Sequence, residues 1–215
     1  MASVRARRAA YAQFNVSLPQ LNDANGERVV VKASKSTRRT IVVRTRRAYF
    51  DCTFGQLHVR TAFPTTGGFD EQVTLCCLHP LDASSRIFSR LLPQVADVRS
   101  VYAPDLPGYG ESDSSPARGI ADAALAVADL ASGLRLRQID LLGVQYGAEV
   151  AIELAASRPD LVRRLVLAGV PAAERLQAIK QQRLIVDTAS YGDDPFAAAP
   201  DILARQIGSF LSANP

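Results

Sequence analysis

The chain has 215 residues, of which 47% are hydrophobic and 21% charged. A chain of this length and composition buries roughly two thirds of its unfolded surface in one core, which predicts a single globular domain. It contains no uninterrupted apolar run of the roughly 18 residues that a membrane-spanning helix needs, so no membrane partner is expected.

Positive charge is concentrated at the start of the chain. Residues 1–50 hold 11 Lys+Arg against 2 Asp+Glu, a net charge of +9, whereas residues 51–215 carry a net charge of −5. Residues 1–46 are therefore interpreted as a basic, partly disordered extension, and residues 47–215 as the folded domain. A basic arm without an apolar segment is not a secretory signal; an organelle transit peptide, a nucleic-acid arm and a protein-binding arm are the other interpretations. Nucleic acid is not the expected partner, because aromatic residues do not interleave the arginines and the domain is acidic.

Two short β-branched segments, residues 29–31 and 41–43, predict edge strands blunted by arginines. Residues 48–61 follow, with a turn at 54–56, and predict a β-hairpin leading into the sheet. His58 lies on this hairpin and is expected to be a half-exposed strand histidine without a catalytic partner.

Residues 73–78 form a nearly continuous apolar run, which is typical of a strand buried on both faces. The run includes Cys76 and Cys77, whose side chains must point to opposite faces, and a third cysteine, Cys52, lies on the hairpin. Reduced, inert thiols and a cytoplasmic location are the simplest interpretation. The cysteine spacing does not match a metal site, and neither a metal nor a cofactor is predicted.

The middle of the chain alternates helix and strand signals. Ser84 and Ser85 predict the N-cap of one helix with Ile87, Phe88 and further leucines on its apolar face. Residues 98–103 predict a strand, and the loop at 105–113 reads Asp-Leu-Pro-Gly-Tyr-Gly-Glu-Ser-Asp. A helix is expected from 115 to about 130, with Gly133 as its stop signal.

The chain is organised around the segment Gly143-Val144-Gln145-Tyr146-Gly147. An apolar strand at 139–142 precedes it and an amphipathic helix follows it. Two glycines around three residues at such a junction allow the helix to pack closely on the sheet. This is the pattern of a nucleophile elbow, Gly-x-Ser-x-Gly, with glutamine in place of serine.

The loop at 105–113, the elbow and the turn from Arg158 into a strand at 165–167 together resemble the α/β-hydrolase superfamily, over residues 47–170. The resemblance implies an α/β fold with a doubly wound, mostly parallel sheet and a pocket at the carboxyl ends of the strands. In the family, the loop at 105–113 has a structural task, which Asp105 and Ser112 would perform by hydrogen bonding. By resemblance, the elbow residue is Gln145, the oxyanion-hole N–H groups belong to Tyr146 and Leu81, and the pocket includes His79, Pro80, Gly143 and Gly147.

Three features depart from the family pattern. Gln145 replaces the nucleophile, Pro80 stands where glycine is usual, and no histidine follows His79. The 44 residues after Pro171 have room for only a strand at 184–188 and a helix at 201–212, so the cap and the acid-bearing strand are expected to be absent. The last strand would then lie against the strand that contains Val166; an unfolded tail is the rival interpretation.

Three hypotheses for function follow. The first is a hydrolase of small ester, amide or carbon–carbon substrates with an incomplete triad, which leaves enzyme activity open. The second is a non-catalytic small-molecule binder, and the third a partner-binding protein that uses the basic arm. A sheet edge left exposed beside the Val166 strand would promote dimerisation.

Overall fold

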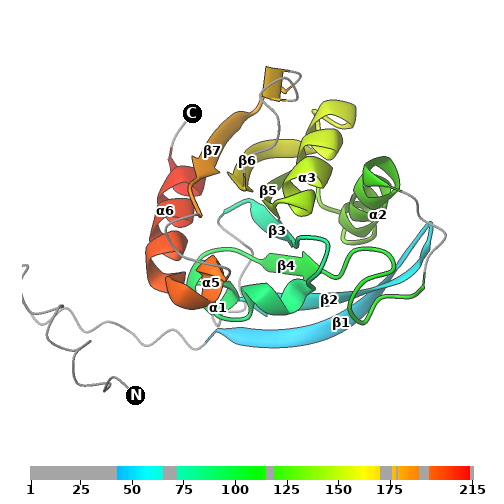
Figure 1. Ribbon diagram of the computed structural model, residues 1–215, viewed down its shortest axis with the longest axis horizontal. Coiled ribbons are helices and arrows are strands. Elements are labelled where there is room, and N and C mark those ends of the chain that lie inside the picture. Colours follow the sequence, from blue (N-terminus) through cyan, green and yellow to red (C-terminus); the bar gives the residue numbers. More distant parts are fainter. Residues whose placement is uncertain are drawn as a thin grey trace, which may run out of the picture. The chain divides into compact units, whose positions relative to one another are not determined.

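The structure, a computed structural model, describes residues 43–64, 72–114, 119–169, 176–177, 179–188 and 194–213. Within these ranges seven strands form one sheet, in the order β1-β2-β4-β3-β5-β6-β7 (Figure 1). The strands are β1 (Arg44–Cys52), β2 (Gly55–Phe63), β3 (Thr74–Leu78), β4 (Val101–Pro104), β5 (Ile139–Val144), β6 (Val162–Ala168) and β7 (Gln182–Val186). The helices are the 3-10 helix η1 (Ser85–Phe88) and α1 (Leu92–Val95), α2 (Ile120–Gly133), α3 (Tyr146–Ser157), α5 (Pro195–Ala198) and α6 (Pro200–Ser212).

The sheet is mostly parallel, as predicted. β1 pairs with β2 and β2 with β4 in antiparallel register, whereas β3, β4, β5, β6 and β7 are joined by parallel pairs. Helices α2 and α3 cover one face, and α1, α5 and α6 cover the other (Figure 1). Because both faces are covered, every residue of β3 and of β5 is buried.

The predicted hairpin is present and longer than expected. Cys52 pairs with Gly55 across a two-residue loop at Thr53 and Phe54. Gly55 has φ of +113°, a backbone conformation that residues other than glycine rarely adopt. β1 begins at Arg44, inside the segment predicted as a basic extension, while residues 1–42, with the predicted strand at 29–31 and most of that at 41–43, lie outside the described residues.

The prediction of a single helix after Ser84 is wrong, because the segment forms η1 and α1 instead. Ser84 caps η1 as predicted, since its Oγ accepts a hydrogen bond from the Arg86 N–H at 3.4 Å. Pro93 stands in the first turn of α1 and has no N–H to donate to a preceding carbonyl, so a continuous helix cannot run through it. The apolar face was nevertheless identified correctly, because Phe88, Leu91 and Leu92 are buried.

The expected helix after residue 115 begins at Ile120 and ends at Gly133. Residues 115–118 lie outside the described part of the chain. The residue that takes positive φ after this helix is Arg135, with φ of 56°. Gly133 therefore ends the helix without supplying the left-handed turn.

β7 and α6 are part of the same fold as the preceding elements. β7 pairs with β6, with Val166 opposite Leu184, and α6 packs against the same layer as α1. The last strand therefore lies where the sequence places it, and the unfolded-tail interpretation is wrong for β7 and α6. The prediction of an exposed sheet edge beside the Val166 strand is also wrong, because β7 pairs there. Dimerisation itself stays a prediction. None of the helices in the described residues combines the length and apolar character needed to cross a membrane.

Candidate functional site

The junction between β5 and α3 is held in an unusual backbone conformation. Gln145 has φ of 49° and ψ of −109°, outside the regions that residues with a side chain normally occupy. Such a conformation costs on the order of 1–3 kcal/mol and persists only where its surroundings fix it. Here the Gln145 N–H donates to the Ala168 carbonyl at 2.7 Å, and the Gln145 carbonyl accepts from Ala148 N–H at 2.9 Å.

The two flanking glycines are required by close approach of backbone atoms. A Cβ on Gly147 would overlap the Leu78 carbonyl, and a Cβ on Gly143 would overlap the Gly147 carbonyl and Ala148 Cα. Gly147 therefore allows the first turn of α3 to approach the end of β3, and Gly143 allows it to approach β5. This is the local reason for the Gly-x-x-x-Gly spacing.

The Gln145 side chain is exposed at the carboxyl end of β5, beside the half-buried Tyr146. Burial raises the pKa of the Tyr146 hydroxyl, and the neighbouring Tyr109 and Asp122 raise it further. The hydroxyl is thus neutral around pH 7 and can donate a hydrogen bond. The amide of Gln145 can also donate or accept hydrogen bonds, but it is not a nucleophile at neutral pH.

His79, predicted as a pocket residue, is fully buried and has both ring nitrogens engaged. The Leu106 N–H donates to Nε2 at 2.9 Å, so the proton must be on Nδ1, which donates to the Pro80 carbonyl at 2.7 Å. Burial lowers the pKa of His79, against smaller opposing effects of the Pro80 carbonyl and Asp105. A neutral imidazole with no free nitrogen joins the loops after β3 and β4 and cannot act as a general base.

The remaining oxyanion-hole candidate, Leu81, is 44% exposed in the turn after His79, and Pro80 is half-buried. A Cβ on Gly147 would also lie 2.9 Å from the His79 carbonyl, so this turn adjoins the start of α3. The structure thus brings the predicted pocket residues to one end of the sheet. The donor role of the Leu81 and Tyr146 N–H groups stays a prediction.

The loop at 105–113 is a hydrogen-bonded unit, as predicted. Ser112 Oγ donates to the Asp105 carbonyl at 2.7 Å and accepts from the His58 N–H at 3.0 Å. The Asp105 carboxylate accepts from the backbone N–H groups of Ser85 at 2.6 Å and Glu111 at 2.8 Å. Burial alone would raise the pKa of Asp105, but these hydrogen bonds outweigh it and hold the pKa below its ordinary value.

The prediction that His58 is a half-exposed strand histidine without a partner is wrong. Its side chain is only 1% exposed, and Nδ1 lies 2.9 Å from Asp105 Oδ2, which as an ionised carboxylate can only accept. Nδ1 therefore carries a proton and donates it to Asp105. Sequence analysis missed the pair because the two residues lie 47 positions apart, and only the β2–β4 pairing brings them together.

Comparison with known proteins agrees with this architecture. A family model described as the alpha/beta hydrolase fold matches residues 73–210, which is more than half of the chain. The chain belongs to the α/β-hydrolase fold family. The match includes the elbow segment, the loop at 105–113 and most of the last helix.

Two curated relatives and one solved structure illustrate the similarity of this α/β-hydrolase family member to known enzymes. A 2-hydroxymuconate semialdehyde hydrolase of Pseudomonas sp. (strain CF600) is 37% identical over 99 residues, which are 41% of this chain and 34% of that protein. A pimeloyl-[acyl-carrier protein] methyl ester esterase of Neisseria meningitidis is 33% identical over 135 residues, 63% of this chain and 46% of that protein. The haloalkane dehalogenase DbeA of Bradyrhizobium elkani is 28% identical with a TM-score of 0.52, over 58% of this chain and 42% of that one. The chain thus spans between a third and a half of the relatives' lengths.

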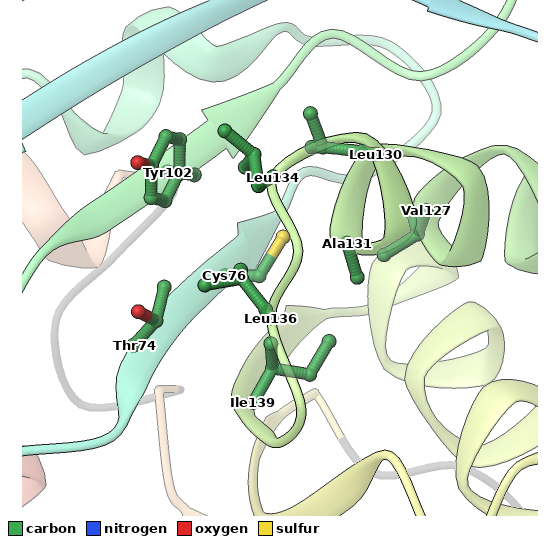
Figure 2. Close-up of a pocket in the computed structure, with 9 residues that line it drawn as sticks. All are labelled: Thr74, Cys76, Tyr102, Val127, Leu130, Ala131, Leu134, Leu136 and Ile139. Atoms are coloured by element: carbon green, nitrogen blue, oxygen red, sulfur yellow. The ribbon is translucent and has the colours of Figure 1, made fainter.

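One apolar pocket of this hydrolase-fold protein lies away from the elbow (Figure 2). Thr74 and Ile139, which line it, begin β3 and β5, whereas Gln145 follows the carboxyl end of β5. Cys76 points into the pocket, and burial raises its pKa to about 12, so its thiol remains protonated and inert. The full lining is Thr74, Cys76, Tyr102, Val127, Leu130, Ala131, Leu134, Leu136 and Ile139.

Proposed function

We propose that this α/β-hydrolase family member binds a small carbonyl compound, an ester, amide or ketone, at the carboxyl edge of its sheet without forming a covalent intermediate. The observation that carries the proposal is the conformation of Gln145. Its positive φ between a buried strand and a helix, with Gly143 and Gly147 around it, fits the position of the family's nucleophile. An amide at that position can hold a carbonyl group by hydrogen bonding but cannot attack it.

The histidines support the same conclusion. The 215 residues contain two, His58 and His79. His79 uses both ring nitrogens in backbone hydrogen bonds, and His58 is buried on β2 with Nδ1 on Asp105. His79 has no free nitrogen to relay a proton to a group bound at Gln145, and His58 lies on β2, which β4 and β3 separate from β5 in the sheet. We infer that the nucleophile and the catalytic histidine of a serine triad are both missing from this chain.

The binding proposal is tested with an aryl ketone of the size of 4-nitrophenyl butyrate, which cannot be hydrolysed. Isothermal titration calorimetry should show binding to the wild-type protein and its loss in Gln145→Trp, because the larger side chain fills the space at the strand end. Gln138→Trp is the matched control, since Gln138 is exposed immediately before the amino end of the same strand. An equal loss of binding in Gln145→Trp and Gln138→Trp would count against a site at the elbow. So would the absence of binding to the wild-type protein.

A second candidate function is slow hydrolysis by a water molecule that Gln145 positions beside the Tyr146 N–H. The names of the relatives favour it, since one is a semialdehyde hydrolase and the other a methyl ester esterase. Oxyanion binding alone retains part of the rate enhancement of a triad enzyme. The test is hydrolysis of 4-nitrophenyl butyrate, compared with an inert-protein control. Turnover above that control that is abolished in Gln145→Ala and preserved in Gln138→Ala would favour hydrolysis over binding alone.

A further inference from the structure

One face of the β1–β2 hairpin gathers arginine side chains at the edge of the sheet. In the antiparallel register Arg47 stands opposite Arg60, and Tyr49 stands opposite His58. Residues two apart on a strand share a face, so these four side chains lie on the same side of the hairpin. This hairpin forms the outer edge of the described sheet (Figure 1).

The opposed arginines are a destabilising arrangement as they stand. Like charges directly opposite in an antiparallel pair repel one another. In addition, Arg60 Nε is buried and has no hydrogen-bond partner among the described residues. A buried guanidinium donor without an acceptor costs desolvation free energy that the fold does not recover. An anion between Arg47 and Arg60 would remove both costs.

A second unpartnered nitrogen lies two residues along the same face. His58 Nε2 is buried without a hydrogen-bond partner in the described part of the chain, on a side chain that is 1% exposed. Glu111 Oε2 lies 3.8 Å from this nitrogen, which is beyond hydrogen-bond distance but within ion-pair distance. His58 therefore faces a carboxylate and is not counted among the donors to an added anion.

The surrounding charges leave a positive excess at this face. Glu111 is paired with Arg86 of η1 at 2.8 Å, and that hydrogen bond, with the charges of His58, Arg47 and Arg86, lowers the Glu111 pKa. The Asp105 carboxylate is occupied by its two backbone donors and by His58. Neither Arg47 nor Arg60 forms an ion pair with a carboxylate in the described residues, although the charge of Arg47 acts on Glu111. The three arginines Arg47, Arg60 and Arg86 outnumber the two carboxylates, Asp105 and Glu111, at this face.

We propose that the face defined by Arg47 and Arg60, called here the hairpin arginine face, is an oxyanion-binding site. The ligand is a phosphate or carboxylate group that accepts hydrogen bonds from the Arg47 guanidinium and, after a shift of the Arg60 side chain that exposes it, from Arg60 Nε. Guanidinium groups match the geometry of both anions, because their donors are arranged in a fixed planar fork. Tyr49 lies on the same face, is 55% exposed, and has its ring centroid 5.4 Å from that of His58. This site is separate from the elbow and does not depend on the function proposed there.

The test is a calorimetric titration of the full chain with inorganic phosphate and, separately, with citrate, at constant ionic strength set with sodium chloride. We expect saturable binding of at least one anion, weakened about tenfold or more in Arg60→Gln and in Arg47→Gln, since each change removes a charge-assisted hydrogen bond. Tighter binding of phosphate would identify a phosphoryl group as the natural ligand, and tighter binding of citrate a carboxylate.

Arg46→Gln is the matched control, because Arg46 is an exposed arginine on the same strand and points to the opposite face. The affinity of Arg46→Gln for the anion should stay within about twofold of wild type. This result would show that the weaker binding in Arg60→Gln and Arg47→Gln reflects the hairpin arginine face rather than net charge. In the folded wild-type protein, phosphate or citrate should also shift the Nε–Hε resonance of Arg60 in a ¹H–¹⁵N spectrum. Absence of saturable binding of both anions, an equal loss in Arg46→Gln, or an unmoved Arg60 resonance would overturn the proposal.

Discussion

The Leu106 N–H donates a hydrogen bond to Nε2 of His79, and this one contact fixes the protonation state of a buried imidazole. A protonated Nε2 could not accept from Leu106, and the charge would be buried. The pKa of His79 is accordingly lowered, mainly by burial. In the unfolded chain the same ring takes up a proton at its ordinary pKa of 6.5.

The pH dependence of folding should therefore carry a His79 contribution. Because the folded-state pKa lies below the unfolded one, the unfolded state binds more protons once the pH falls below about 6.5. The contribution is fully present above that pH and is lost as the pH falls through the depressed pKa. Urea unfolding at pH 7.5 and pH 5 should show a smaller loss on acidification in His79→Gln, whose amide oxygen can accept from Leu106 without titrating. An identical loss in both proteins would contradict this account of His79.

Gly147→Ala should destabilise the fold, because its Cβ would overlap the Leu78 carbonyl, which is held in the sheet. We expect a loss of about 1–3 kcal/mol in the free energy of unfolding, the usual cost of overpacking. The control is Gly208→Ala in α6, where an added Cβ meets nothing within 4 Å. There the greater helix propensity of alanine should raise stability by about 1 kcal/mol. Chemical denaturation of both variants measures the contrast, and similar effects of the two changes would argue against close packing at the elbow.

The elbow shows what local sequence can and cannot establish. Gly143 and Gly147 identified the strand–turn–helix junction because their spacing reflects contacts within a few residues and with the adjacent β3. The break between η1 and α1 was missed although Pro93 was visible, because the apolar spacing on both sides of it was continuous. Local pattern thus located the buried faces more reliably than the ends of the elements.

Long-range polar pairs could not be predicted at all. The His58 and Asp105 side chains meet only because β2 and β4 are neighbours, and hydrophobic periodicity carries no information about which polar residues face each other. The same limit applies to Asp140, which lies within the segment predicted as an apolar strand and is fully buried against two arginines. The hairpin arginine face depends on the register that places Arg47 opposite Arg60, and the sequence left this register undetermined.

Backbone strain at Gln145 gives a prediction about stability and function together. Gln145→Gly should raise the free energy of unfolding by about 1 kcal/mol, because glycine adopts positive φ without steric cost and offsets part of the 1–3 kcal/mol of strain. Ligand binding at the elbow should be lost at the same time, since the amide is removed. Gln138→Gly, just before the same strand and without positive φ, should not stabilise the protein. Thermal unfolding of the two variants decides the point, and a destabilised Gln145→Gly would show that the side chain contributes more than its backbone costs.

The buried ion pairs at the opposite end of β5 should be strongly coupled. Asp140 is completely buried, and accepts from Arg163 at 2.9 and 2.6 Å and from Arg99 at 3.3 Å. Asp140→Leu would leave the Arg99 guanidinium, on a residue that is 1% exposed, without its carboxylate and should cost about 3–5 kcal/mol.

The double variant Asp140→Leu/Arg99→Leu removes both charges and should recover part of that loss, because no unpaired ion then remains buried beside the leucine. Arg163 is partly exposed and also donates to the Leu211 carbonyl at 2.9 Å, so it can remain solvated and still hold α6 in place. Chemical denaturation of the wild type, both single variants and the double variant completes the thermodynamic cycle. A double variant as unstable as the sum of the two single variants would mean that Arg99 and Asp140 act independently, against the geometry that joins them.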